Sequence, residues 1–198
     1  MGLDKLSQLA FKYETDKCPQ LKHPFTPFYY NLLKNKQKSI KKVLEIGVGS
    51  REMDWWRSYR TGASLFMWRD FFPNAQIYGA DNNPKAMVSA NAKRIKTFLC
   101  DQSNRENLLN LIEQTGPNID LVIDDGSHRS NDQIFTCLTL MPIINKSVIY
   151  IIEDAVFTRK ISTALNQYTC WVPNLNGKFK DDKLVVVTNK QSFSANKK

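Results

Sequence analysis

Lys42-Val43-Leu44-Glu45-Ile46-Gly47-Val48-Gly49 decides the fold class, because this short apolar run ends in a glycine-containing turn. Similar apolar runs follow along the chain, separated by segments whose apolar residues have helical spacing. We expect strands at residues 42–47, 76–80, 95–99, 120–123 and 148–152, and helices at residues 64–72, 105–114 and 131–140. This alternation predicts an α/β fold, with a Rossmann-like, doubly wound, mostly parallel sheet covered by helices on both faces.

The C-terminal part departs from this alternation. Residues 168–172 and 183–188 have the composition of strands and flank a turn-rich segment. They predict a C-terminal antiparallel hairpin, which brings the sheet to seven strands. Because no linker or repeat divides the 198 residues, we expect a single domain. Its N-terminal arm or lid would span residues 1–40, and its Rossmann-like core residues 41–198.

Composition narrows the class of protein. The chain is 42% hydrophobic and 24% charged. It has no apolar run near the roughly 20 residues that cross a bilayer, and its first residues lack a signal-peptide pattern. The four cysteines lack CxxC spacing, which favours reduced thiols over disulfides or zinc. We therefore expect no membrane span and a cytoplasmic protein, in the host cytoplasm if it is viral.

The net charge of +9 comes from 28 basic and 19 acidic residues. Many lysines lie at residues 34–42 and after Gly177, in stretches that resemble a loop and a tail. Such runs are usually solvated surface, although they can contact a polyanion. We favour the solvated surface, so nucleic acid is not the expected partner. A homo-oligomer stays open.

Acidic residues follow the expected strands at the points where they end. Right-handed crossovers place the carboxyl ends of parallel strands on one edge of the sheet, where ligands of such sheets bind. One acid there is an ordinary turn residue, but a series of strands ending this way predicts a site. The acids are Glu45, Asp81, Asp101, Asp124, Asp125, Glu153 and Asp154.

The first two strands predict a nucleotide-type site. Gly47 and Gly49 allow backbone to approach a ligand closely, but the stretch is not GxGxxG, so a plain tight turn is an equal alternative for the glycines alone. Glu45, two residues before the first glycine, suits a ligand with a cationic amino group. Asp81 ends the next strand, where a carboxylate can accept both ribose hydroxyls. Together these residues favour an adenosyl cofactor.

At this point the chain resembles the class I S-adenosylmethionine-dependent methyltransferases, and within them the macrocin- and mycinose-type (macrolide sugar) O-methyltransferase family. The resemblance runs from about residue 12 to about residue 157. It is carried by residues 12–17, 23–26, 43–49, 62–68, 72–81, 101–103, 124–128 and 150–154. It implies methylation of a sugar hydroxyl, with S-adenosylmethionine and magnesium as cofactors. Similar modules occur in larger glycan-building proteins.

The cofactor-binding residues expected from the strand ends and from this resemblance form one set. Within it, Asp124 either shapes the cofactor site or holds backbone, and Thr15 and Lys17 belong to the arm. The set comprises Thr15, Lys17, Glu45, Gly47, Gly49, Ser64, Asp81, Asn82, Asp101, Gln102 and Asp124.

The acids that follow the expected strands at 120–123 and 148–152 carry the chemistry that the resemblance implies. Oxygen ligands favour Mg²⁺, with Mn²⁺ or Ca²⁺ as alternatives, over zinc. By resemblance, Asp125, Glu153 and Asp154 are the metal ligands, with Asp125 therefore also catalytic, and His128 is the general base. Taken alone, Asp125 could be a turn residue and His128 a polar residue at a helix N-terminus. Adjacent side chains on a strand point to opposite faces, so the chain must turn at Glu153-Asp154 for both to share an ion.

Three departures from the family pattern stand out. Glu14 replaces a usual glycine, and residues 145–147 replace a glycine pair before the fifth strand. Residues 155–157, Ala-Val-Phe, replace a more polar aromatic stretch directly after Asp154. The last change bears on the acceptor pocket, so the acceptor of the family cannot be transferred to this chain.

Other aromatic and arm residues have two interpretations. Trp55, Trp56 and Tyr59 could wall a sugar ring or fold an insertion back onto the core. Trp68, Phe71 and Phe72 are expected in the core. The arm residues Tyr13, Thr15, Lys17 and His23 could close over the site as a lid or belong to a structural arm.

The sequence thus predicts a magnesium-dependent O-methyltransferase that acts on a sugar, a deoxyhexose in a glycan or glycosylated metabolite. The net charge of +9 leaves RNA ribose methylation as an alternative. Methylation of a catechol is another, because a catechol presents oxygens to a metal as a vicinal diol does. A non-catalytic nucleotide-binding module is the alternative from another class.

Overall fold

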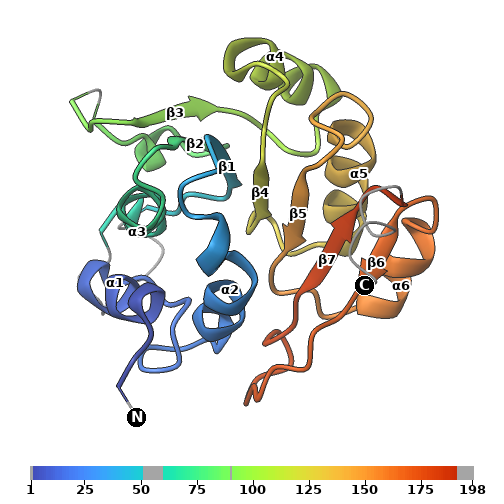
Figure 1. Cartoon of the computed structure of the whole chain (residues 1–198). Helices are drawn as coiled ribbons and strands as arrows, with labels where there is room; N and C mark the ends of the chain where they lie inside the picture. Colours follow the sequence, from blue (N-terminus) through green and yellow to red (C-terminus); the bar gives the residue numbers. More distant parts are fainter. Residues whose placement is uncertain (1, 51–59, 90, 191–198) are drawn as a thin grey trace.

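The computed structural model describes residues 2–50, 60–89 and 91–190 (Figure 1). Over these residues it contains one seven-stranded sheet in the order β3-β2-β1-β4-β5-β7-β6. The strands are β1 (Lys42–Ile46), β2 (Gln76–Asp81), β3 (Ile95–Leu99), β4 (Leu121–Asp124), β5 (Ile149–Ile152), β6 (Thr169–Trp171) and β7 (Val185–Thr188). β1 to β5 pair in parallel, and β7 pairs antiparallel with both β5 and β6. The predicted fold class and the C-terminal hairpin are confirmed.

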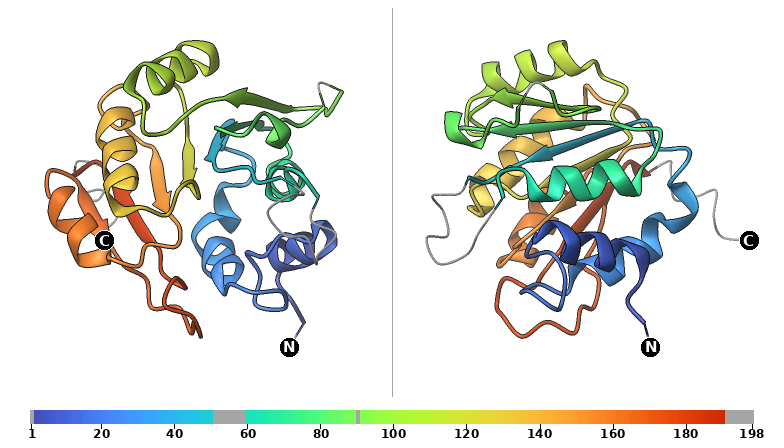
Figure 2. Two further views of the ribbon diagram at one scale, coloured as in Figure 1. Left: turned by 180° about the vertical axis from the view of Figure 1, so that it is seen from behind. Right: turned by 90° about the vertical axis from the view of Figure 1, so that its left-hand side faces the viewer.

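Helices cover both faces of the sheet (Figure 2). One core cluster unites the sheet with α1 (Lys5–Tyr13), α2 (Phe25–Leu33) and α3 (Ala63–Phe71). A second cluster, on the other face, unites it with α4 (Arg105–Thr115), α5 (Ser130–Leu140) and α6 (Thr158–Ala164). Short 3-10 turns lie at η1 (Lys34–Lys36) and η3 (Pro84–Ala86). Trp68, Phe71 and Phe72 are fully buried, as predicted.

The central strands are nearly continuous apolar runs because both of their faces are covered. All four residues of β4 are buried, and four of the five residues of β1 are buried. Register brings the ends of these strands together: Ile46 pairs with Ala80 of β2 and with Asp124 of β4, and Asp124 pairs with Ile152 of β5. The residues that follow β1, β4 and β5 therefore meet at one edge of the sheet.

The N-terminal segment contains two helices that the sequence patterns did not predict. α1 begins at Asp4, whose side chain accepts a hydrogen bond from the Ser7 backbone N–H at 2.9 Å. It ends at Glu14, which is left-handed with φ 59°. A left-handed helix end favours glycine, which is the residue the related family usually has at this position. Tyr29 of α2 packs edge-on against Trp68 of α3, with ring centroids 5.2 Å apart.

α6 was also not predicted, and its seven residues bury only Ile161. Among the helices of residues 2–50, 60–89 and 91–190, none combines the length and apolar character needed to cross a lipid bilayer.

Candidate active site

A cavity of about 810 Å³ lies at the carboxyl edge of the sheet. Residues that follow β1, β2, β3, β4 and β5 line it, together with residues from the segment between α1 and α2. The predicted cofactor residues that line it are Gly47, Gly49, Asp81, Asn82, Asp101 and Gln102. Asp125, His128, Glu153 and Asp154 line it as well. The strand-end acids therefore meet on one edge, as the predicted topology requires.

Backbone forms much of one end of this cavity. Gly47 and Gly49 have φ of 87° and 72°, and a Cβ at position 47 would collide with the backbone of Asp125 and Gly126. Asp81 holds this turn, because its Oδ2 accepts hydrogen bonds from the N–H groups of Val48 at 2.9 Å and Gly49 at 3.0 Å. The tight turn is thus real, and it brings the two strand ends into contact.

Glu45 lies beneath this turn and is completely buried. Neither of its carboxylate oxygens has a hydrogen-bond partner among the described residues, although Lys17 Nζ lies 3.3 Å from Oε1. Burial, together with the nearby Asp125 charge, raises the pKa of Glu45 to about 7, against the lowering effect of Lys17. Buried carboxylate oxygens without partners are costly, and a ligand with a cationic amino group would satisfy them. The Glu45 carboxylate therefore fits the amino group of the predicted cofactor.

Asp124 acts on the cavity through Gln102. Its Oδ1 accepts from Gln102 Nε2 at 3.1 Å, and its Oδ2 accepts from the Tyr150 hydroxyl at 3.0 Å. Gln102 in turn accepts from the Ser127 backbone N–H at 2.6 Å, which holds the loop that carries His128. Asp124 is fully buried, and burial raises its pKa to about 7. It does not line the cavity itself, and its contact with the cavity runs through Gln102.

Four further members of the predicted cofactor set also lie off the cavity wall. These are Thr15, Lys17, Glu45 and Ser64, each of which is at most 3% exposed. Tyr13 is likewise absent from the wall, and its hydroxyl donates to Asp70 Oδ2 at 2.5 Å.

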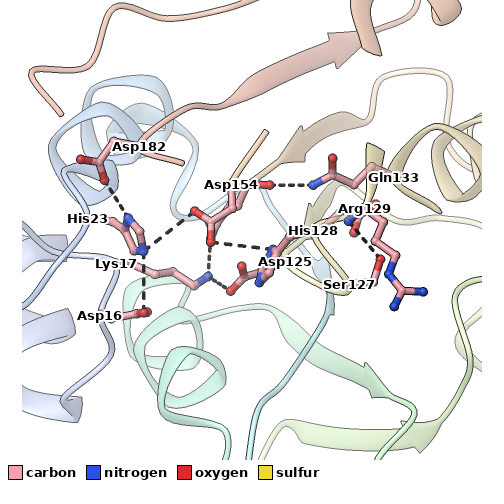
Figure 3. Close-up of polar contacts among 12 residues, drawn as sticks. Asp16, Lys17, His23, Asp125, Ser127, His128, Arg129, Gln133, Asp154 and Asp182 are labelled. Carbon is pink, nitrogen blue, oxygen red and sulfur yellow. Dashed lines mark hydrogen bonds and ion pairs between the residues drawn. The ribbon is translucent and has the colours of Figure 1, made fainter. Parts of the chain in front are cut away.

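The acidic end gathers Asp125, His128 and Asp154 (Figure 3). One ligand atom from each of these residues lies within 4.8 Å of the others, and His128 Nδ1 is 3.7 Å from Asp154 Oδ2. His128 and Asp154 both have left-handed backbone, with φ of 56° and 49°. Such strained backbone persists where the surroundings impose it, and it clusters at functional sites. β5 ends at Ile152, so the turn that the sequence demanded at Glu153-Asp154 is present.

Glu153, a predicted metal ligand, lines the cavity, and groups of the N-terminal segment hold its carboxylate. Its carboxylate accepts hydrogen bonds from Lys17 Nζ at 2.5 Å and from the Tyr29 hydroxyl at 2.5 Å, and it is 1% exposed. It is not part of the three-residue group, in which His128 takes the third place. Lys17 engages both Asp125 and Glu153, and all three members of the predicted set of Asp125, Glu153 and Asp154 line the cavity, so their role as metal ligands stays a prediction.

Lys17 is the cation of this acidic end. Its ammonium lies 2.5 Å from Asp125 Oδ2, 2.5 Å from Glu153 Oε2 and 3.3 Å from Glu45 Oε1, and the residue is 2% exposed. Burial alone would lower the pKa of Lys17, but these carboxylates raise it well above its usual value. In the structure Lys17 is a buried counter-ion that joins the two ends of the site, and its predicted contact with the cofactor stays a prediction.

His23 also reaches the cavity, from the segment between α1 and α2. Its Nδ1 lies 2.7 Å from Oδ1 of Asp182, a residue just before β7 (Figure 3). The sequence placed His23 in an arm or lid and gave Asp182 no role. The motif at residues 23–26 was the available signal for His23. No local pattern marks Asp182, because its partner is 159 residues away.

The donor set at the acidic end fits a divalent cation. Asp125 and Asp154 supply carboxylate oxygens, which suit Mg²⁺ or Mn²⁺, whereas the imidazole nitrogen of His128 is a ligand more typical of transition metals. The carboxylates of Glu45, Asp125, Glu153 and Asp154 outnumber the single ammonium of Lys17 among them. Trp55, Trp56 and Tyr59, the predicted sugar wall, lie outside the described residues.

No family model matches the chain. Curated relatives include the mycinamicin VI 2''-O-methyltransferase of Micromonospora griseorubida, 39% identical over 149 residues, and the demethylmacrocin O-methyltransferase of Streptomyces fradiae, 37% identical over 150 residues. A third is the 8-demethyl-8-(2-methoxy-alpha-L-rhamnosyl)-tetracenomycin-C 3'-O-methyltransferase of Streptomyces olivaceus, 36% identical over 149 residues. Each match covers 75% of this chain but only 35% or 36% of the relative, so the chain corresponds to about a third of these proteins.

Solved structures give the same relationship. The chain is similar to the MycE methyltransferase of the mycinamycin pathway in complex with Mg, SAH and mycinamycin VI, with a TM-score of 0.73 and 29% identity. This match covers 93% of the chain and 54% of that protein. The fibrillarin pre-rRNA processing protein of Methanococcus jannaschii, at 15% identity and a TM-score of 0.55, shares the fold alone and matches over 76% of this chain and 66% of its own.

Proposed function

We propose that this chain, a homologue of the sugar O-methyltransferases of macrolide and polyketide pathways, transfers a methyl group from S-adenosylmethionine to a sugar hydroxyl with the help of a divalent metal. Because the chain spans about a third of these relatives, the activity of the whole protein is part of this proposal.

One observation carries the proposal: a single cavity joins a cofactor-type end to a metal-type end. Gly47 and Asp81 lie at the first end, and Asp125, His128 and Asp154 lie at the second. All five residues line the same cavity. Methyl transfer needs the methyl donor and the acceptor oxygen held side by side in line. A shared cavity at one edge of the sheet provides that arrangement.

At the cofactor end, S-adenosylmethionine would supply an electrophilic methyl group. The backbone of Gly47 and Gly49 would pack against it, and Asp81 and Asn82 would contact the ribose. Asp101 and Gln102 would contact the adenine. The unpartnered oxygens of Glu45 would accept hydrogen bonds from the amino group. Lys17 keeps a positive charge beneath this end and limits the repulsion among the acids.

At the acidic end, Asp125 and Asp154 would hold Mg²⁺, with Mn²⁺ or Ca²⁺ as alternatives. The bound ion would make an acceptor hydroxyl more acidic. The third ligand is either Glu153, as the resemblance implies, or His128, as the side-chain arrangement favours. We propose His128 as the general base, because its ring lines the cavity and is 44% exposed beside Asp154.

His128→Ala separates the two roles of the imidazole. If His128 is the base, turnover should fall by about 10²–10⁴-fold while Mn²⁺ affinity, measured by calorimetry, stays within about twofold. A parallel loss of Mn²⁺ affinity would instead make His128 a ligand. Asp132→Asn is a matched control, because Asp132 lines the same cavity but bonds to Ser127. Unchanged turnover in His128→Ala would exclude both roles.

The acceptor is proposed to be a deoxyhexose in a glycan or glycosylated metabolite. The acidic cavity favours a neutral sugar over RNA, whose phosphates the carboxylates would repel. In the stretch Ala155-Val156-Phe157, next to Asp154, Val156 and Phe157 expose an apolar surface, and Phe157 is 63% exposed. We also place the reaction in a reducing compartment such as the cytoplasm, since all four cysteines are free thiols.

Labelled S-adenosylmethionine tests the function directly. The chain, with a panel of methyl deoxyhexosides, should transfer label in the presence of Mg²⁺, lose that activity in EDTA and regain it when Mg²⁺ is restored. Full activity after metal removal would contradict the metal role. Transfer to catechol or RNA but to no glycoside would replace the acceptor class. Failure to bind S-adenosylhomocysteine in calorimetry would favour a non-catalytic module.

A further inference from the structure

We propose that His23, oriented by Asp182, binds the acceptor: its Nε2 accepts a hydrogen bond from the hydroxyl next to the one that is methylated. This inference rests on the proposed function and adds an acceptor-contacting residue from the N-terminal segment. It starts from a buried imidazole that faces the cavity with one nitrogen unpartnered.

The His23 ring is held rigidly on two sides. It stacks on the Phe25 ring with centroids 4.8 Å apart and planes 6° from parallel. Its Nδ1 lies 2.7 Å from Asp182 Oδ1. Asp182 is itself fixed, because its Oδ2 accepts from the backbone N–H groups of Lys178 at 2.5 Å and Phe179 at 2.7 Å. The direction of the other ring nitrogen is therefore set before any ligand binds.

This pairing also fixes the tautomer of the neutral ring. An ionised carboxylate only accepts hydrogen bonds, so Nδ1 must carry the proton that it shares with Asp182. In the neutral ring, Nε2 is then an acceptor with a free lone pair. His23 is 2% exposed, and Nε2 has no hydrogen-bond partner among the described residues. Buried polar atoms of this kind are rarely left without a ligand or water.

A second unpartnered acceptor lies close to Nε2. Nε2 is 3.9 Å from Asp154 Oδ1, which also lacks a partner among the described residues, and 3.9 Å from Asp16 Oδ2 (Figure 3). One hydroxyl has one proton to donate and can satisfy only one of two acceptors. Two hydroxyls on neighbouring carbons can satisfy both. The geometry selects a sugar that presents a pair of adjacent hydroxyls, with His23 taking one of them.

The loop that carries Asp182 is shaped for this contact. A Cβ at Gly177 would collide with the Asp182 side chain, so the glycine allows the loop to wrap around the carboxylate. A histidine with a purely structural role would have both ring nitrogens satisfied. Here Nδ1 is satisfied by Asp182, whereas Nε2 of this cavity-lining residue has no hydrogen-bond partner among the described residues.

The test uses His23→Asn, whose amide can still donate to Asp182 but lacks an atom at the Nε2 position. His23→Gln is the conservative rescue, because its amide oxygen can reach toward that position. Thr26→Val is the matched control, because Thr26 is fully buried nearby and bonds to Ser7, away from the cavity. The acceptors are methyl α-L-rhamnopyranoside and its monodeoxy analogue that lacks the hydroxyl next to the methylated one.

The wild-type chain should lose about 30-fold in kcat/KM when that neighbouring hydroxyl is removed, because a buried acceptor is then unpartnered. His23→Asn should lose a similar factor on the intact glycoside, mainly through KM, and should no longer distinguish it from the deoxy analogue. His23→Gln should recover part of the discrimination. Thr26→Val should discriminate as the wild type does.

Two results would overturn the inference. In the first, His23→Asn discriminates between the two glycosides as strongly as the wild type. In the second, Thr26→Val loses discrimination equally, which would trace the effect to a loosened arm. S-adenosylhomocysteine binding by calorimetry should stay within about twofold in every variant. If the wild type binds S-adenosylhomocysteine but methylates no glycoside, the proposed function fails, and this inference fails with it.

Discussion

The two ends of the cavity are built in different ways. At the cofactor end, one continuous stretch from Glu45 to Gly49 supplies the turn, and Asp81 of the neighbouring strand holds its backbone N–H groups. At the acidic end, side chains from three distant segments converge: Lys17 and His23 lie between α1 and α2, Asp125 follows β4 and Asp154 follows β5. The first end depends on local backbone, whereas the second depends on how the N-terminal segment packs against the sheet.

This difference has a consequence for charge. The backbone end has one buried acid, Glu45, whereas the acidic end places Asp125, Glu153 and Asp154 close together. Lys17 contacts both ends and is the cation they share. The arm that carries Lys17 is therefore part of the electrostatics of the site, whichever role its other residues have.

Removal of Lys17, the cation shared by the two ends, should have the largest effect on stability. Lys17→Met leaves Glu45 and Glu153 buried without a positive partner, so unfolding free energy should fall by about 3–5 kcal/mol in metal-free buffer. Mn²⁺ adds positive charge to the same carboxylates, so it should raise the midpoint of thermal unfolding more in this variant than in the wild type. Lys12→Met is the control, because Lys12 pairs with Asp70 at 60% side-chain exposure. Equal Mn²⁺ shifts in all three proteins would contradict this role.

Asp154→Asn should affect ligand binding at the acidic end but not at the cofactor end. Asparagine tolerates the left-handed backbone at this position, so the fold should be kept. Loss of the carboxylate should lower turnover on the order of 10³-fold and weaken Mn²⁺ binding, with S-adenosylhomocysteine affinity nearly unchanged. Asp101→Asn should do the opposite, weakening S-adenosylhomocysteine binding and sparing Mn²⁺. Calorimetry with each ligand measures both, and loss of both ligands in either variant would show that the ends are not independent.

Gly47→Ala tests the backbone end by stability. The new Cβ would collide with the backbone of Asp125 and Gly126, at a residue with φ 87°. We expect a loss of about 2–3 kcal/mol in urea unfolding. Gly2→Ala is the control, because a Cβ there meets nothing within 4 Å, and it should change stability by less than about 0.5 kcal/mol. Similar stabilities for the two variants would refute the tight-turn assignment.

Local patterns predicted most of the sheet because local chemistry specifies it. The strand expected at 95–99 is β3 (Ile95–Leu99), and the other predicted strands of the parallel sheet agree within one residue at either end. The helices of the N-terminal segment and α6 were missed. α6 is short and buries little, so it depends on tertiary packing more than on its own pattern.

The candidate site was predicted in part. The turn at Glu153-Asp154 is present, and Asp125, His128 and Asp154 come together. The direction of the Glu153 side chain could not be predicted, because Lys17 and Tyr29, which bind its carboxylate, come from the N-terminal segment. The roles of Lys17 and His23 escaped prediction for the same reason. The metal, base and cofactor roles of these residues stay predictions until the variants are measured.

The amino-acid sequence by itself determined the parallel sheet, the edge on which its acids meet and the glycine turn, because periodicity and strand-end chemistry act over a few residues. Only the tertiary structure decided that Lys17 is buried among Glu45, Asp125 and Glu153. It also decided that His23 is oriented by Asp182, a residue just before β7. Those choices depend on contacts between segments more than 100 residues apart, which no local pattern encodes.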